Sequence, residues 1–427
     1  MDCFEVRGGR RLEGSVNASG SKNASLPLMA ASLLMEGPAT FSPVPDLRDI
    51  DTMVLLLAEL GMDIQREGDQ LQIYAADATK TEASYDIVRR MRASICVLGP
   101  LLARRGQARV PLPGGCVFGL RPVDLHVRGM RALGATVKQE NGCLVATAPS
   151  SGLQGASIDL RSAFGSTVLG TINVMSAAVL ARGESVIHSA AMEPEVVEVA
   201  RYLRACGARI EGEGTESLRI QGVPSLNAVP WQLPADRIEA GTLLIAGAIT
   251  AGVVRVNRCR PQELRSLTIA LERTGLTPTQ GEDWIQVDAR GIRLRNIQLE
   301  TGTFPGFPTD LQAQWLALAT QMSGVGSMRE RIYPERFMHV PELQRLGAQM
   351  QRLGDTVQVE GGIALMAAPV LASDLRASAC LVLAGLVAEG TTTVRRVYHL
   401  DRGYVALEKK LQQLGGEVVR RPDDEKA

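Results

Sequence analysis

The chain has 427 residues, of which 45% are apolar but only 4% aromatic, so it is long enough for two or three domains and needs a largely aliphatic core. Lysine plus arginine equals aspartate plus glutamate at 46 each, so no basic bias points to nucleic acid. The longest apolar runs, 243–254 and 377–388, are far shorter than the roughly 20 residues of a bilayer crossing. We therefore expect them to be buried helices and expect no membrane insertion.

The seven cysteines are scattered along the chain, and none belongs to a C-x-x-C pair. An odd, unpatterned set argues against a disulfide framework and against a structural zinc site. The first residues lack a basic stretch followed by an apolar run, so no secretory signal is visible. We therefore expect a cytoplasmic protein with free thiols and no bound metal.

Taken in chain order, one helix-end signal recurs six times. An amphipathic helical pattern ends at a glycine, and a strand-like stretch usually follows. These glycines are 68 to 73 residues apart and are Gly61, Gly134, Gly207, Gly275, Gly347 and Gly415. Glycine commonly ends helices because it adopts the left-handed conformation without strain. The spacing predicts six repeats of about 70 residues.

A second signal, a strongly apolar helix followed by a glycine and a strand, precedes each of these glycines. The apolar helices are expected at 24–34, 93–103, 174–181, 241–249, 311–322 and 377–388. Helices that are apolar all round belong inside a protein, whereas the charged second helices should be half exposed. Solenoid repeats are usually shorter than these units. We therefore expect an α/β fold of two pseudo-threefold domains, each an inside-out barrel. The chain is expected to pass from one domain to the other near 223–234. Two ordinary α/β sandwiches joined there are the alternative.

Residues 111–126 form the most unusual stretch, since three prolines and three glycines exclude a regular element. This loop separates a strand-like segment, 107–110, from a helical pattern at 127–133. Long ordered loops are often functional. Cys116 lies in it with Arg121 five residues later, and a nearby guanidinium lowers a thiol's pKa. From these residues alone, an ordinary surface loop with an incidental cysteine stays an open alternative.

Charged side chains stand where several apolar helices begin. Helix N-termini favour anions, so a carboxylate such as Asp310 can be a plain cap. A cation there is the opposite of what the helix dipole favours, yet Lys22, Arg92 and Arg376 occupy such places. We interpret these three as a basic pocket for phosphate or carboxylate, with solvated surface charge as the alternative.

Eight motifs in one register resemble the enolpyruvyl transferases, the family that includes EPSP synthase, and in particular the branch that acts on UDP-N-acetylglucosamine. The resemblance covers nearly the whole chain. The motifs lie at 19–24, 91–94, 113–116, 121–126, 307–310, 336–340, 374–378 and 401–403.

The resemblance implies the inside-out α/β barrel, with the extreme N-terminus paired into the second domain. It places domain one at 21–229, carrying the Cys116 loop, and domain two at 1–20 and 230–427. The implied reaction moves the enolpyruvyl group of phosphoenolpyruvate to the 3′-hydroxyl of UDP-N-acetylglucosamine and releases phosphate, the first committed step of peptidoglycan precursor synthesis. The family uses no metal or organic cofactor, and the resemblance names no protein partner.

The resemblance also implies roles for single residues. Cys116 is the proton donor and the thiol alkylated by fosfomycin, Asp310 receives or steers the sugar hydroxyl proton, and Lys22 and Arg402 take part in catalysis. The residues implied to bind phosphoenolpyruvate are Lys22, Asn23, Arg121, Arg376 and Arg402. Those implied to contact the sugar nucleotide are Asn23, Arg92, Arg121, Pro122, Val123, Asp124, Leu125, Thr167, Val168, Asp310 and Ile332. The 111–122 loop corresponds to a lid that closes over the ligands.

Two stretches depart from the family pattern. In 167–171 a leucine, Leu169, replaces a glycine of the turn that holds the diphosphate, and the nearest upstream cation is Arg161. Residues 331–335 also differ from the usual segment. The acceptor therefore stays open: a different uridine nucleotide is the alternative. A non-catalytic paralogue that binds nucleotide sugar is a third hypothesis, and the presence of Cys116, Asp310 and Arg402 argues against it.

Overall fold

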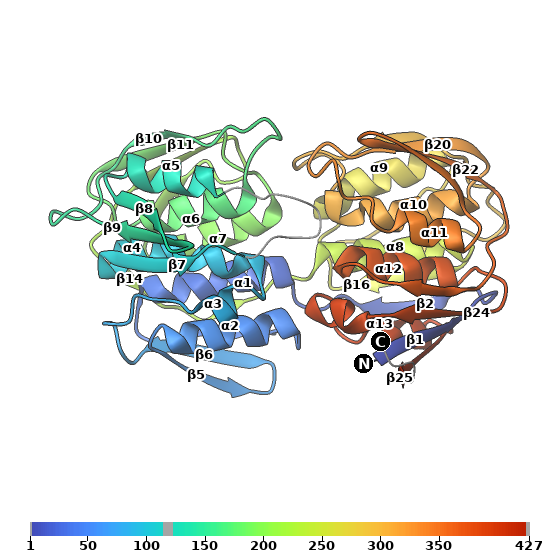
Figure 1. Ribbon diagram of the computed structural model, residues 1–427, viewed down its shortest axis with the longest axis horizontal. Helices are drawn as coiled ribbons and strands as arrows, with labels where there is room; N and C mark the ends of the chain where they lie inside the picture. The colour runs from blue at the N-terminus through green and yellow to red at the C-terminus, as the bar shows by residue number, and fades with distance from the viewer. Residues whose placement is uncertain (1, 114–122, 424–427) are drawn as a thin grey trace. The chain divides into compact units, whose positions relative to one another are not determined.

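The computed structural model describes residues 2–113 and 123–423. The chain divides into two compact units: unit 1 contains Met1–Ser19 and Ala235–Ala427, and unit 2 contains Gly20–Pro234 (Figure 1). Residues 230–234, which the sequence analysis assigned to the other domain, lie with unit 2. The reason is local pairing, because β15 (Trp231–Gln232) runs parallel to β4 (Ala39–Ser42) of that unit.

Three helical segments of unit 2 are buried, and each is followed along the chain by a more exposed helix. The buried segments are α1 (Lys22–Ala31) with the 3-10 turn η1 (Ser32–Leu34), η2 (Arg92–Val97) with α4 (Leu98–Arg105), and α6 (Val168–Ala178). The outer helices are α2 (Arg48–Glu59), α5 (Asp124–Ala132) and α7 (Pro194–Ala205), with a short α3 (Tyr85–Val88).

Unit 1 repeats this arrangement (Figure 1). Its buried helices are α8 (Arg237–Ile249), η4 (Thr309–Leu311) with α10 (Gln312–Gln321), and α12 (Leu375–Gly385). Its outer helical segments are η3 (Pro261–Leu264) with α9 (Arg265–Thr274), α11 (Val340–Arg345), η5 (Val397–Arg402) and α13 (Leu407–Gln413). The sequence prediction of six buried apolar helices is confirmed, since nearly every side chain from Ile238 to Ile249, for example, is buried.

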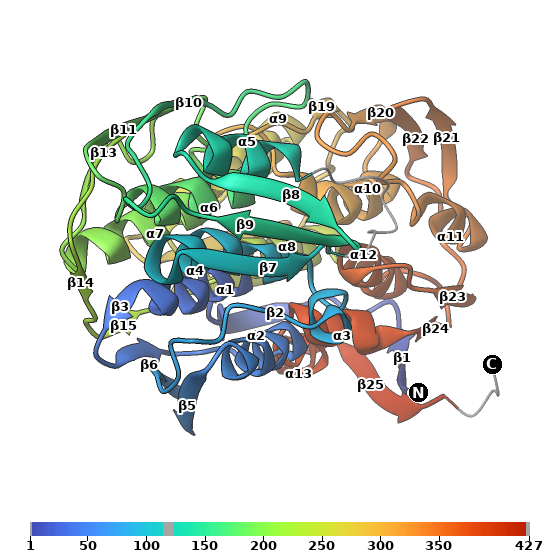
Figure 2. The same ribbon diagram turned by 60° about the vertical axis from the view of Figure 1, so that its left-hand side comes forward.

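Among the described residues of unit 2, the strands form three larger sheets and one small pair; Figure 2 shows the sheet of β7, β9 and β8 in front. In spatial order the strands are β15, β4, β6 (Gln70–Ala75) and β5 (Met62–Glu67); β7 (Gln107–Pro111), β9 (Cys143–Thr147) and β8 (Thr136–Glu140); β10 (Ser157–Asp159), β11 (Glu184–His188), β13 (Ser217–Gln221) and β12 (Arg209–Glu211); and the pair β14 (Leu226–Asn227) and β3 (Met35–Glu36).

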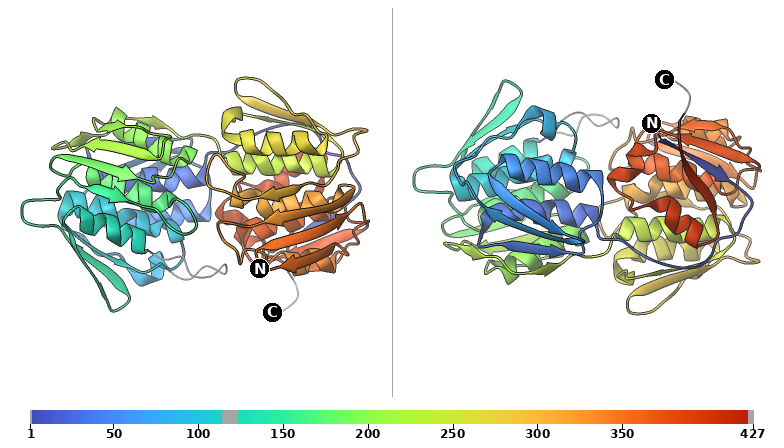
Figure 3. Two further views of the ribbon diagram at one scale, coloured as in Figure 1. Left: turned by 90° about the horizontal axis from the view of Figure 1, so that it is seen from above. Right: turned by 90° about the horizontal axis from the view of Figure 1, so that it is seen from below.

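Unit 1 has three sheets, and Figure 3 shows its strands beside its helices from above and below. In spatial order the strands are β17 (Thr279–Gln280), β18 (Trp284–Asp288), β16 (Val253–Asn257) and β2 (Glu13–Asn17); β19 (Gln298–Glu300), β20 (Gly324–Arg329), β22 (Thr356–Gly361) and β21 (Gln349–Leu353); and β23 (Pro369–Leu371), β24 (Thr391–Arg395), β1 (Asp2–Arg7) and β25 (Glu417–Pro422).

Every four-stranded sheet follows one rule: a parallel pair at one edge, then two antiparallel pairings. The sheet of β7, β9 and β8 keeps the rule, because Glu82 forms a parallel bridge to Arg109 where a fourth strand would lie. In the last sheet β1 stands between β24 and β25, so the N-terminal strand completes the final repeat. The mixed α/β class is confirmed, and the shared strand order is consistent with the predicted sixfold repeat.

The six helix-end glycines have φ angles between 79° and 108°, as the repeat signal predicted. Gly252, which follows the apolar helix expected at 241–249, is different because it is not among the glycines with a positive φ. A Cβ at Gly252 would lie 2.0 Å from the carbonyl oxygen of Leu12, which accepts a hydrogen bond from Val253 N. Close approach of another chain segment, and not backbone conformation, requires glycine at this position.

Candidate functional site

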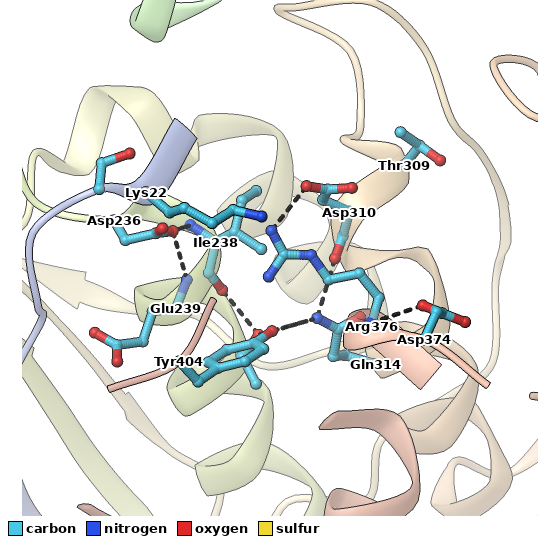
Figure 4. Close-up of polar contacts among 12 residues, drawn as sticks. Lys22, Asp236, Ile238, Glu239, Thr309, Asp310, Gln314, Asp374, Arg376 and Tyr404 are labelled. Carbon is cyan, nitrogen blue, oxygen red and sulfur yellow. Dashed lines mark hydrogen bonds and ion pairs between the residues drawn. The ribbon is translucent and has the colours of Figure 1, made fainter. Parts of the chain in front are cut away.

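In unit 1, one buried amide ties the start of α10 to α8 and to Tyr404, which follows η5 (Figure 4). Gln314 on α10 donates from Nε2 to Thr242 Oγ1 on α8 over 3.0 Å and to Tyr404 Oη over 3.1 Å. The Thr242 and Tyr404 hydroxyls are 2.9 Å apart. Since a buried amide must satisfy its donors, this bonding holds the helix ends in register.

Asp310 lies beside this amide and is held by two arginines. Arg336 Nη1 donates to Oδ1 and Arg376 Nη2 donates to Oδ2, each over 2.8 Å (the latter drawn in Figure 4). The arginine side chains are 7% and 3% exposed, whereas that of Asp310 is 27% exposed. One carboxylate therefore has each oxygen paired with a buried cation while part of its surface stays accessible.

These cations control the ionisation of Asp310. Burial by itself would raise the pKa of this carboxyl, but Arg376 and Arg336 outweigh burial and hold the pKa well below its usual range. At neutral pH the carboxylate is thus an acceptor for a hydroxyl hydrogen and holds a proton only weakly. This is the behaviour of a group that orients an alcohol and passes its proton on.

Arg376 has donor capacity beyond this pair. Burial alone would lower its pKa, yet the nearby Asp310 raises it, so the guanidinium is permanently charged. Its Nη1 is buried and has no hydrogen-bond partner among the described residues. The guanidinium also lies over the ring of Tyr404, 5.4 Å from its centroid. A buried cation with an unused N–H pair is suited to a small anion.

The acids at the helix starts of unit 1 have different roles. Asp236 and Asp374 are N-caps: each carboxylate accepts from two backbone N–H groups at the start of α8 or α12. Asp310 is not a cap, because Pro308 occupies that position of η4 and the carboxylate bonds the arginines. The plain-cap interpretation considered for Asp310 is therefore wrong.

The other predicted residues of unit 1 lie on nearby segments. Arg402 ends η5 and is partly buried, and the preceding Asp401 accepts two hydrogen bonds from Arg420. Ile332 is partly buried, and its N–H donates to Glu330 over 2.8 Å.

The predicted residues of unit 2 stand at the starts of its buried helices. Lys22 and Asn23 open α1, Arg92 opens η2, and Thr167 is the N-cap of α6 with Val168 following. Thr167 Oγ1 accepts from Gly170 N over 3.2 Å. These starts place cations and polar groups at the positive ends of helices, which suits anionic ligands.

Lys22 has an acidic partner that sequence reasoning missed. Its Nζ is 3.3 Å from Asp49 Oδ2, and the two side chains are 12% and 5% exposed. Arg336 and Gln314 were also missed as site residues. Arg336 lies in the motif at 336–340, so the sequence singled out its position, but it did not indicate that Arg336 pairs with Asp310.

The segment after the long loop begins α5. Val123 is the N-cap residue, Asp124 is exposed in the first turn, and Leu125 is buried. His126 is buried, its Nδ1 is 2.9 Å from Asn173 Nδ2, and burial, aided by Arg92, lowers its pKa to about 3. A histidine so held is neutral and positions its neighbours. Three predicted residues lie outside the described residues: Cys116, Arg121 and Pro122.

None of the helices in the described ranges combines the length and apolarity needed to cross a membrane. Within the same residues, no cluster of three or more His, Cys, Asp or Glu side chains is arranged to hold a metal ion.

Comparison with known proteins gives consistent matches. A family model described as EPSP synthase (3-phosphoshikimate 1-carboxyvinyltransferase) matches residues 6–411. A protein of Trichlorobacter lovleyi named UDP-N-acetylglucosamine 1-carboxyvinyltransferase is 47% identical over 420 residues, which are 98% of this chain and 99% of that protein.

Solved structures are similar over the whole chain. The enolpyruvyl transferase NikO from Streptomyces tendae has a TM-score of 0.88 at 26% identity, with 99% of both chains covered. An EPSP synthase from Acinetobacter baumannii has a TM-score of 0.73 at 17% identity, covering 99% of this chain and 100% of that one, which is a likeness of fold alone.

Proposed function

Since the chain belongs to the EPSP synthase family of enolpyruvyl transferases, we propose that it transfers the enolpyruvyl group of phosphoenolpyruvate to the 3′-hydroxyl of UDP-N-acetylglucosamine and releases phosphate. The observation that carries this is Asp310, an ionised carboxylate held between buried Arg336 and Arg376 at the start of a buried helix. The relative at 47% identity supports the choice of acceptor. The reaction would take place in the cytoplasm.

The proposal extends to the architecture. Each unit would be an inside-out α/β barrel, with its three buried helices enclosed by sheets and outer helices. The common strand order of the repeats supports this. Unit 2 would correspond to domain one and unit 1 to domain two.

Phosphoenolpyruvate carries a carboxylate and a phosphate, so its binding needs several cations. Arg376 offers a charged, buried N–H pair without a hydrogen-bond partner among the described residues. Arg402, Lys22 and Arg121 would supply further positive charge, with Asn23 beside Lys22. Guanidinium groups suit both anions because they donate two parallel hydrogen bonds.

The chemistry is an addition followed by an elimination. The sugar hydroxyl oxygen bonds to C2 of phosphoenolpyruvate, and the methylene carbon gains a proton, which Cys116 would deliver. The resulting tetrahedral intermediate then loses inorganic phosphate and a methyl proton, which regenerates the double bond. Asp310 would accept the hydrogen bond of the attacking hydroxyl and steer its proton.

The sugar nucleotide would meet the helix starts of unit 2 and the segment near Ile332. Its proposed contacts are Asn23, Arg92, Arg121, Pro122, Val123, Asp124, Leu125, Thr167, Val168, Asp310 and Ile332. The N-terminus of α6, which Thr167 caps, would offer N–H groups to the diphosphate.

The test is phosphate release from phosphoenolpyruvate with UDP-N-acetylglucosamine, and then with UMP. Wild-type protein should release phosphate with the sugar nucleotide, and Asp310→Asn should lose about 10²- to 10⁴-fold in kcat. Asp288→Asn is the matched control, because both oxygens of Asp288 are likewise paired with a guanidinium, that of Arg290, but its side chain is 43% exposed. Release with UMP and none with the sugar nucleotide would assign the other acceptor.

A further inference from the structure

Another carboxylate of unit 1, Glu330, is buried and has no place in the reaction described above. It is completely buried, and the hydrogen bonds that reach it come from hydroxyl and backbone donors. Thr301 Oγ1, Ile332 N and Tyr333 N donate to Oε1 over 2.7, 2.8 and 3.0 Å, and Thr309 Oγ1 donates to Oε2 over 2.8 Å. Burying a carboxylate is costly, and such bonding is what offsets the cost.

One oxygen of Glu330 fixes the backbone of the following segment. Oε1 receives the N–H groups of Ile332 and Tyr333, and Thr301, which donates to the same oxygen, accepts from Arg331 N over 2.9 Å. Three consecutive N–H groups are therefore tied to this carboxylate or to its hydroxyl partner. Ile332 is the residue of this segment proposed to contact the sugar nucleotide.

The other oxygen is linked through Thr309 to Arg336, one of the two arginines that hold Asp310. Because Thr309 gives its hydroxyl hydrogen to Oε2, its oxygen presents lone pairs elsewhere and accepts from Arg336 Nη1 over 3.1 Å. The same nitrogen of Arg336 donates to Asp310 Oδ1. Figure 4 shows Thr309 next to Asp310 at the start of η4.

We propose that Glu330 is a positioning residue for the transfer reaction, which joins the acceptor-binding segment at Ile332 to the Thr309–Arg336 pair that aims Asp310. The inference rests on the proposed function. Through one carboxylate, the orientation of the sugar and the orientation of the carboxylate that steers its hydroxyl proton become dependent on each other.

Glu330→Gln tests this with little change in shape. A carboxamide has a single acceptor oxygen, so its NH₂ group must face either Thr309 or the Ile332 and Tyr333 N–H groups. Either orientation breaks one branch of the network. We expect kcat/KM for UDP-N-acetylglucosamine to fall about 10- to 100-fold, the scale of a small misplacement of reacting groups. The KM for phosphoenolpyruvate should change less than threefold, since Arg376 is untouched.

Glu335→Gln is the matched control. Glu335 lies in the same segment, but its side chain is 69% exposed and pairs with Arg352 over 2.8 Å. Its kinetics should equal those of the wild type. A second pair of variants covers the case that Glu330→Gln does not fold: Thr309→Val should lose kcat, and Thr309→Ser, which keeps the hydroxyl, should recover it.

The outcomes separate the two proposals. Wild-type protein without phosphate release would refute the proposed function and the positioning role with it. Active wild type with an equally active Glu330→Gln would overturn only the positioning role. A fully active Thr309→Val variant would also overturn the positioning role. So would a Glu330→Gln variant whose kcat/KM falls equally for both substrates and whose melting temperature is lower.

Discussion

Replacing Arg336 by methionine is the sharpest test of the pair of cations around Asp310. The substitution removes the guanidinium and keeps an apolar stem of similar length. Asp310 Oδ1 loses its donor, and Thr309 Oγ1 loses the same donor nitrogen, whereas Arg376 still binds Oδ2. The carboxylate is therefore left half paired and not isolated.

The expected loss follows from these contacts. A hydrogen bond to a charged group contributes about 1.5–3 kcal/mol, and one to a neutral hydroxyl about 1 kcal/mol. The gross loss is then about 2.5–4 kcal/mol. Because the Asp310 side chain is 27% exposed, water replaces part of what is lost. We expect the free energy of unfolding to fall by about 2–3 kcal/mol, below the range for a fully buried pair.

The pH dependence has a definite sign. The folded-state pKa of Asp310 is depressed, so its stabilisation is complete above its unfolded value of about 4 and is lost as pH falls through the folded pKa. Arg336→Met makes the depression smaller. The stability difference between wild type and variant should therefore be largest at neutral pH and should narrow in acid.

Urea unfolding at pH 7 and in acid measures both quantities. A Trp231→Phe background leaves fluorescence to Trp284 and Trp315, which belong to unit 1. Arg290→Met is the control, since Arg290 binds both oxygens of an exposed aspartate, and its removal should leave stability essentially unchanged. The reasoning would be refuted if Arg336→Met lost no more unfolding free energy than the control variant. It would also be refuted if the stability difference between wild type and Arg336→Met grew in acid.

Two further predictions concern other parts of the chain. Arg420→Ala should lower both the melting temperature and kcat, because Arg420 binds Asp401 beside the end of η5. Arg421→Ala should change neither, because Arg421 belongs to an exposed ion pair. Equal effects of the two variants in calorimetry and steady-state assays would argue against a role of the Arg420–Asp401 pair. Peptide mapping after fosfomycin treatment should find the label on Cys116 and not on Cys143, which is half-buried whereas the other described thiols are buried. Labelling of Cys143 alone would contradict the assignment, as would a fully active Cys116→Ser variant.

Local features of this protein could be predicted from its residues. The six glycines end their helices because only the left-handed conformation closes those turns, and that preference belongs to the residue itself. The apolar helices are buried because no side of them favours water. The prediction of an enolpyruvyl transferase, made from eight motifs, is confirmed by the family match and the 47% identical relative.

Partnership between distant residues was decided only by the tertiary structure. Asp310 reads from the sequence as a helix cap, but its oxygens bond arginines 26 and 66 residues away. The family resemblance places the N-terminus in the second domain, but nothing local indicates that β1 lies between β24 and β25, or that Gly252 is needed to admit Leu12. Backbone preferences and apolar periodicity act within a few residues, whereas ion pairs, strand order and close approach depend on which segments the fold brings together.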